Sequence, residues 1–145
     1  MIQRIQSIFL LLSAATFGAL FKLPFATGEA SATGYLADGS FNAFDHPVLL
    51  IATILGALLS VIALFLFRQR KNQIKATYGI MVIAIALPVA AFLILGQQTA
   101  AGSVNATLHQ QVGLFLPGAA ILFSLIAGYF IRKDEKLVQS MDRLR

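Results

Sequence analysis

Four long stretches without a charged residue constrain this chain more than any other feature of its sequence. A transmembrane helix needs about 20 apolar residues to cross ~30 Å of hydrocarbon, because an α-helix rises ~1.5 Å per residue. The first stretch reaches that length only if Lys22 extends its charged end to the interface, so that Leu23–Phe25 can join the span. The sequence therefore predicts an all-α integral membrane protein, a four-helix bundle in one domain over residues 1–145, with spans at about residues 5–23, 48–67, 76–96 and 112–131.

The composition favours a membrane protein over a soluble domain. Hydrophobic residues make up 58% of the chain and charged residues 12%, whereas soluble domains contain roughly 45–50% and about 25%. A soluble domain of this length would have too few polar side chains to cover its surface. The chain also has no cysteine, which excludes disulfides, thiolate nucleophiles, CxxC redox chemistry and thiolate metal sites.

The basic residues gather on one side of the four-span topology. Ten of the eleven Lys and Arg residues lie before the first span, between the second and third, or after the fourth, and only Lys22 lies on the other side. Under the positive-inside rule, this bias predicts that both termini are cytoplasmic. It accounts for the net charge of +5 without a nucleic-acid partner. The basic loop at residues 68–75 is expected to contact anionic lipid as well.

The first stretch is predicted to be a retained helix and not a cleaved signal peptide. A cleavage-like sequence, Ala30-Ser31-Ala32, does follow it. However, Lys22 and Pro24 lie between the apolar stretch and that sequence, which is unlike a signal peptide.

The sequence predicts different structures for the two outer loops, which follow the first and the third span. Asp38-Gly39 lies between two short runs in residues 35–42, and Asp-Gly is a strong hairpin signal because Gly accepts the positive φ of a type I′ turn. This register would place Leu36 opposite Phe41, in a small β-hairpin that leans on the mouth of the bundle. Residues 97–111 are polar and are predicted only to link the third and fourth spans.

No Asp, Glu, Lys, Arg or His lies inside any of the four uncharged stretches. Proton-coupled transporters, ion pathways and voltage sensors use such residues within the membrane, so the sequence argues against these classes. His46 and His109 fall at or outside the outer interface, where a metal or quinone-headgroup site is less expected than two interfacial polar residues. In that simpler interpretation Asp45 is the N-cap of the second helix and Pro47 lies in its first turn. The sequence predicts no enzyme and no catalytic, cofactor-binding or metal-binding residue.

Two prolines and three stripes of small residues leave alternatives open. Pro88 lies inside the third span and Pro117 inside the fourth. Prolines mark broken helices in some transporters, but most of them only kink a membrane helix. The small-residue stripes predict close packing within the bundle, with docking of another membrane subunit as the alternative. Their members are Ala14 and Gly18, Ala52, Gly56 and Ser60, and Ala120, Ser124 and Gly128.

Eight of the last fourteen residues carry a charge. The basic residues nearest the membrane help to hold the C-terminus in the cytoplasm. Four apolar residues from Leu137 onward fall on one face of a helix, and charges of both signs occupy the rest, which suits water or a protein partner better than lipid. We therefore expect an amphipathic cytoplasmic helix over residues 132–145, either a solvated extension of the fourth span or a docking site. The candidate docking residues are Lys136, Leu137, Met141, Asp142, Arg143, Leu144 and Arg145.

Both ends of the chain resemble one family. MIQRIQSIFLLL at the start and RKDEKLVQSMDRLR at the end are similar to the four-helix membrane proteins of Bacteroidota grouped as domain of unknown function 4293. The order of the four spans matches that family along the whole chain. The resemblance implies a protein of the bacterial inner membrane, and it implies no activity, cofactor or catalytic residue.

These features lead to functional hypotheses of different classes. The leading one is a non-enzymatic accessory or scaffolding subunit, which docks a membrane or cytoplasmic protein through its tail or its small-residue helix faces. The alternative is a transporter or channel for an uncharged or lipidic solute, which uses the kinked third and fourth helices. An enzyme acting through His46 and His109 is the weakest hypothesis.

Overall fold

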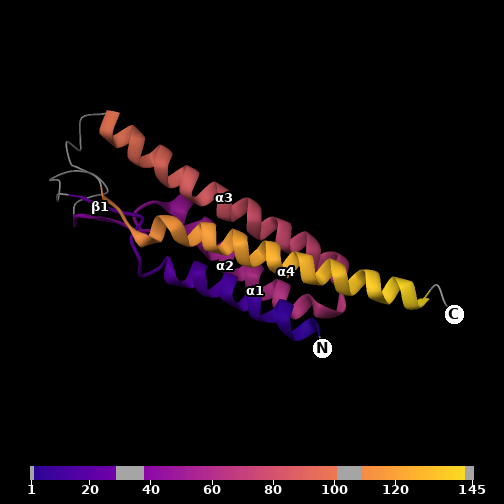
Figure 1. Cartoon of the computed structure of the whole chain (residues 1–145). Helices are drawn as coiled ribbons and strands as arrows, with labels where there is room; N and C mark the ends of the chain where they lie inside the picture. The colour runs from indigo at the N-terminus through magenta and orange to yellow at the C-terminus, as the bar shows by residue number, and fades with distance from the viewer. Residues whose placement is uncertain (1, 29–37, 101–108, 143–145) are drawn as a thin grey trace.

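A computed structural model describes residues 2–28, 38–100 and 109–142 (Figure 1). Within these residues the long helices are α1 (Ile2–Ala19), α2 (Pro47–Phe65), α3 (Arg70–Ala100) and α4 (Val112–Asp142), and a short 3-10 helix, η1 (Leu66–Arg68), joins α2 to α3. The helices lie side by side, and α1 begins at the same end of the bundle at which α4 ends (Figure 1). This arrangement agrees with an even number of passes along the bundle.

Three of the described helical segments are long and apolar enough to cross a membrane, namely Pro47–Arg68, Arg70–Gln97 and Val112–Ser140. The apolar part of α1 is shorter, Ile5–Ala19. After Ala19 the chain turns, with the amides of Lys22 and Leu23 bonded to the Ala19 carbonyl oxygen. Pro24 has no amide hydrogen and disfavours a helical residue before it. Leu23–Phe25 therefore do not extend α1, in contrast to the sequence-based expectation.

The helices pack in a ring, in which α1 and α3 each contact both α2 and α4. Large apolar side chains from every helix are buried in its interior: Leu10, Phe17, Leu20, Leu49, Ile80, Leu87 and Ile131. The outward faces are apolar too, since Leu11, Val82 and Leu122 are each at least 60% exposed. Helices that are apolar on all sides suit a hydrocarbon environment better than water.

Most of the small residues lie at helix contacts inside the bundle. Gly56 of α2 packs so closely on Phe17 of α1 that a Cβ atom there would lie 2.4 Å from ring atom Cε1. One turn further on, the Ser60 and Ser13 hydroxyl oxygens are 3.3 Å apart. Gly18 is the exception, because a Cβ there would meet nothing within 4 Å. The stripe on α2 thus serves packing within the bundle.

At the opposite end of the bundle from the start of α1, three short strands join the loops (Figure 1). β1 (Ala26–Thr27) pairs antiparallel with both β2 (Ser40–Phe41) and β3 (His109–Gln110), in the order β2-β1-β3. Gly39, just before β2, has a φ of 72°, the positive value predicted for the turn. Phe41 pairs with Ala26, while its predicted partner Leu36 lies outside the described residues. β3 falls in the segment expected only to link two helices, so that segment also ties the two outer loops together.

Candidate docking site

Helix α4 does not end where its apolar segment ends. Among the α4 side chains whose burial is described, Ile131 is the last that is fully buried. The helix nevertheless continues without a break to Asp142 and projects past its neighbours (Figure 1). Residues 132–142, which we call the α4 extension, contain no Gly or Pro and several good helix formers. At ~1.5 Å per residue this extension reaches roughly 16 Å beyond Ile131.

One ion pair fixes the first turn of the α4 extension to the start of α3. Arg70 Nη2 lies 3.1 Å from Asp134 Oδ2, and Arg70 Nη1 donates a hydrogen bond to the Asp134 backbone oxygen at 3.0 Å. Both side chains are largely shielded from water, with exposed fractions of 23% and 16%. Because a guanidinium group is planar, two contacts from one group fix its orientation as well as its distance.

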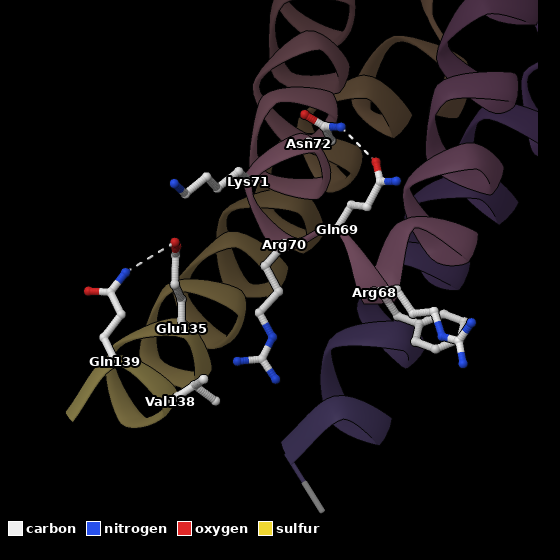
Figure 2. A pocket seen from close by; sticks show the side chains of 9 residues that line it. Arg68, Gln69, Arg70, Lys71, Asn72, Glu135, Val138 and Gln139 are labelled. Atoms are coloured by element: carbon white, nitrogen blue, oxygen red, sulfur yellow. Dashed lines mark hydrogen bonds between the residues drawn. The ribbon is translucent and has the colours of Figure 1, made fainter. Parts of the chain in front are cut away.

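A groove runs between the α4 extension and the connection from α2 to α3 (Figure 2). It has a volume of about 720 Å³ and is lined by Phe67, Arg68, Gln69, Arg70, Lys71, Asn72, Glu135, Val138 and Gln139. Figure 2 shows Arg70 reaching into the space between the two walls, with Glu135 and Val138 on the α4 side. One hydrogen bond within each wall steadies the polar lining. Three cations, one carboxylate and two apolar side chains make a mixed surface, which suits a polypeptide segment better than a uniformly charged ligand.

The structure describes part of the predicted docking set. Lys136 and Leu137 are exposed on the α4 extension, Leu137 to 45%. Met141 and Asp142 belong to the last turn of α4, whereas residues 143–145 lie outside the described residues. Val138 is 38% exposed and also lines the groove, so the apolar face and the groove are continuous.

The Arg70–Asp134 pair lies outside the predicted set. The two residues are 64 positions apart, and only the relative heights of α3 and α4 bring them together. A signal is nevertheless present in the sequence, because Arg70 follows the second apolar stretch closely and Asp134 is the first acidic residue after the fourth. Opposite charges at the same end of neighbouring helices are natural partners.

The start of α2 differs from its prediction in one residue. His46 is the N-cap, with extended backbone angles, and its Nδ1 accepts a hydrogen bond from the Val48 amide at 3.2 Å. Pro47 occupies the first turn as predicted. Asp45, the predicted cap, instead accepts a hydrogen bond from the backbone amide of Asn42. Its carboxylate closes the preceding turn, because it sits one residue too early to reach the free amides of the helix.

Polar side chains at this end of the bundle make hydrogen bonds within the fold. Burial raises the pKa of Asp45 above its ordinary value, the nearby Asp38 raises it further, and the hydrogen bond from Asn42 opposes both. His109 belongs to β3, and His46 caps a helix. Among the residues that the structure describes, no group of three or more His, Asp or Glu side chains is placed to hold a metal ion.

The described interior of the bundle contains polar side chains but no ionisable ones. Its buried polar residues are Gln6, Ser13, Thr53, Ser60, Gln73, Thr77 and Ser124. Three of the hydroxyls bond the carbonyl four residues earlier in their own helix, and Gln73 Nε2 donates to the Ala63 oxygen of α2 at 3.0 Å. Helices α3 and α4 continue through Pro88 and Pro117. Among the described buried polar groups, Gln73 and the Ser13–Ser60 hydroxyl contact link neighbouring helices.

Comparison with known families agrees with the resemblance at the two ends of the chain. A model of the family described as a domain of unknown function (DUF4293) matches residues 2–144. The chain belongs to this family. The match includes every described helix, the small sheet and the α4 extension, so all of them are part of the family's domain. Comparisons with curated proteins and with solved structures gave no match, and the family description assigns no activity to the groove.

Proposed function

We propose that this protein is a non-enzymatic accessory or scaffolding subunit of a bacterial inner membrane. In this proposal it crosses the bilayer four times, with both termini in the cytoplasm. The basic connection between α2 and α3 lies at the same end of the bundle as the start of α1 and the end of α4 (Figure 1), which is the distribution that the positive-inside rule requires. The shorter α1 is accommodated by local thinning of the bilayer around it.

The observation that carries the docking role is the preformed α4 extension. It is already helical and is already held by Arg70, so a partner would not have to order it on binding. Ordering costs roughly 1–2 kcal/mol per residue for the backbone alone, and its avoidance favours association. Leu137 and Val138 present apolar surface beside the groove, which fits a protein partner that packs on an amphipathic helix.

Capture of partners from native membranes tests this role. The full-length protein, solubilised in mild detergent, is compared with a variant carrying Leu137→Ser and Val138→Ser. The double variant should lose most of a partner that the unaltered protein retains, because it removes the apolar face while leaving the ion pair at Asp134. Lys133→Ser is the matched control, since Lys133 is exposed on the same extension and does not line the groove. An identical set of captured proteins for all three forms would count against the docking role.

The transporter alternative has less support. It would use kinks at Pro88 and Pro117, but described side chains from all four helices fill the middle of the ring. Flux of uncharged solutes into liposomes that contain the purified protein would revive this alternative.

A further inference from the structure

A second cleft lies between α3 and α4, apart from the groove at the α4 extension. Its volume is about 240 Å³, and it is lined by Ile74, Thr77, Tyr78, Met81, Leu125, Gly128, Tyr129 and Arg132. Arg132 is the first charged residue after the apolar stretch of α4, and the lining residues of α3 begin just after its basic N-terminal turn. The cleft therefore spans the level at which the surface of the bundle changes from apolar to charged.

The cleft opens on the outside of the bundle. Three of its lining side chains, Tyr78, Leu125 and Tyr129, are 48%, 50% and 64% exposed. Pockets that enclose a small molecule usually measure ~300–1,000 Å³, so this cleft would hold only part of a ligand. The remainder of the ligand would lie along the outer surface of α3 and α4.

A missing side chain creates the floor of the cleft. Gly128 has no Cβ, and one built there would lie 3.5 Å from the Thr77 methyl carbon Cγ2. The Thr77 hydroxyl donates to the Gln73 backbone oxygen at 2.9 Å, so its hydrogen-bonding capacity is used within α3. Met81 and Leu125 also line the cleft, so its lining away from Arg132 is mainly apolar and suits a hydrocarbon chain.

The mouth of the cleft is positive. The Arg132 guanidinium carbon Cζ lies 5.3 Å from the centre of the Tyr78 ring, a cation–π contact that positions the cation without neutralising it. No carboxylate is among the residues that line the cleft. Tyrosine and arginine at the edge of an apolar span are typical of the headgroup level of a bilayer.

We propose that this cleft binds an anionic phospholipid. Its phosphate pairs with Arg132 at the mouth, and one acyl chain lies along the floor over Gly128. Basic pockets between membrane helices on the cytoplasmic side bind anionic headgroups in this way. The inference rests on the membrane placement proposed above, but it does not depend on the docking role of the α4 extension.

Lipid binding to the purified full-length protein in detergent tests the headgroup contact. The probes are phosphatidylglycerol, phosphatidylcholine with the same acyl chains, and inorganic phosphate, with binding followed by native mass spectrometry and by the shift in unfolding temperature. Phosphatidylglycerol should bind best and stabilise most. Arg132→Gln should weaken that binding about tenfold, because one charge-assisted hydrogen bond is lost. Lys133→Gln is the control. Lys133 carries the same charge and is the next residue in the chain, but it does not line the cleft.

A second pair of variants tests the floor. Gly128→Leu fills the cleft, whereas Gly118→Leu makes the same exchange on α4 where a Cβ would meet nothing within 4 Å. Only the first should reduce lipid binding. Arg132 is exposed, so its variant stays informative even if Gly128→Leu does not fold.

Three results would overturn the proposal. They are equal binding of the two lipids, a stabilisation by inorganic phosphate as large as that by phosphatidylglycerol, or unchanged phosphatidylglycerol binding in Arg132→Gln. Each can occur while the α4 extension still captures a partner, so failure here is distinct from failure of the docking role.

Discussion

Arg70 shows how one side chain can set the direction of a helix end. Exposed ion pairs are worth only ~0.2–1 kcal/mol, but this pair is mostly shielded and is supported by a second contact to the Asp134 backbone. Removal of Arg70 would leave the Asp134 carboxylate shielded from water without its partner, which costs more than the loss of a surface pair. The α4 extension therefore owes its fixed position to a residue outside α4.

The first prediction concerns this contact. Arg70→Gln should raise amide hydrogen exchange in residues 132–142 about tenfold, which corresponds to ~1.4 kcal/mol of local stability. Lys71→Gln is the matched control, because Lys71 is the next residue in the chain and carries the same charge. It should have no such effect, because the Lys71 side chain is exposed. Exchange measured by mass spectrometry in detergent decides the matter, and equal rates in the two variants would show that packing alone holds the extension.

The start of α2 shows what sequence can predict about single residues. The sequence predicts a helix start at Asp45-His46-Pro47, and the helix begins at Pro47. The cap is His46 and not Asp45, one position later than predicted. Asp45 is engaged by the turn from Asn42, and that turn depends on the pairing of the preceding strand, which local sequence does not encode.

At the scale of elements, α4 is fixed at its start and again at the first turn of the α4 extension. Its start is tied to the segment that follows α1, because the amides of Gln111 and Gly113 donate to the carbonyl oxygens of Phe25 and Pro24, each at 3.1 Å. The Gln111 side chain adds a hydrogen bond to Thr27 at 2.7 Å. These contacts join the chain around β1 to the beginning of α4, although the two lie far apart in the sequence.

The second prediction tests this junction. A Cβ at Gly113 would lie 2.3 Å from the Pro24 backbone oxygen, and backbone atoms cannot move aside as a flexible side chain does. Gly113→Ala should therefore lower the free energy of unfolding by ~1–3 kcal/mol. Gly118→Ala, five residues further along the same helix, should be neutral or stabilising by up to ~1 kcal/mol, since a Cβ there meets nothing within 4 Å. Unfolding by denaturant in detergent compares the two, and equal stabilities would contradict the close contact.

The helices could be predicted from the sequence, and the sheet only in part, because long helices leave a local pattern and short strands do not. Long apolar stretches predicted helices where α2, α3 and α4 lie, although α3 (Arg70–Ala100) begins six residues before its predicted span and ends four residues after it. Gly39 predicts its turn, because glycine adopts a positive φ more easily than any other residue. A two-residue strand such as β3 has no period to detect, and its partner Ala26–Thr27 lies more than 80 positions earlier. The groove escapes prediction likewise, because it forms between segments from two distant parts of the chain.

At the scale of the whole molecule, the charges divide by end. The α2–α3 connection and the α4 extension, which carry basic residues, lie at one end of the bundle, and α1 ends near the other (Figure 1). Lys22 follows three residues after the end of α1. Between the two ends, the helices expose many large apolar side chains on their outward faces. A bilayer placed across this surface would separate Lys22 from Lys71.

The third prediction concerns orientation. The chain has no cysteine, so a single introduced cysteine reports its own position without background. Lys22→Cys should react with a membrane-impermeant maleimide in intact spheroplasts, whereas Lys71→Cys should react only after the membrane is permeabilised. Both side chains are exposed, which makes them matched positions. The reverse pattern would place both termini outside the cytoplasm.

The continuity of α4 has a mechanical consequence. Because one helix runs from Val112 to Asp142, the part within the bilayer and the part beyond it cannot tilt independently. Membrane helices adjust their tilt to the thickness of the surrounding hydrocarbon, and any such adjustment would swing Leu137 through the same angle. In the proposed membrane placement, the α4 extension is thus the outer arm of one continuous helix, and a docked partner would move with any change in the tilt of the inner arm.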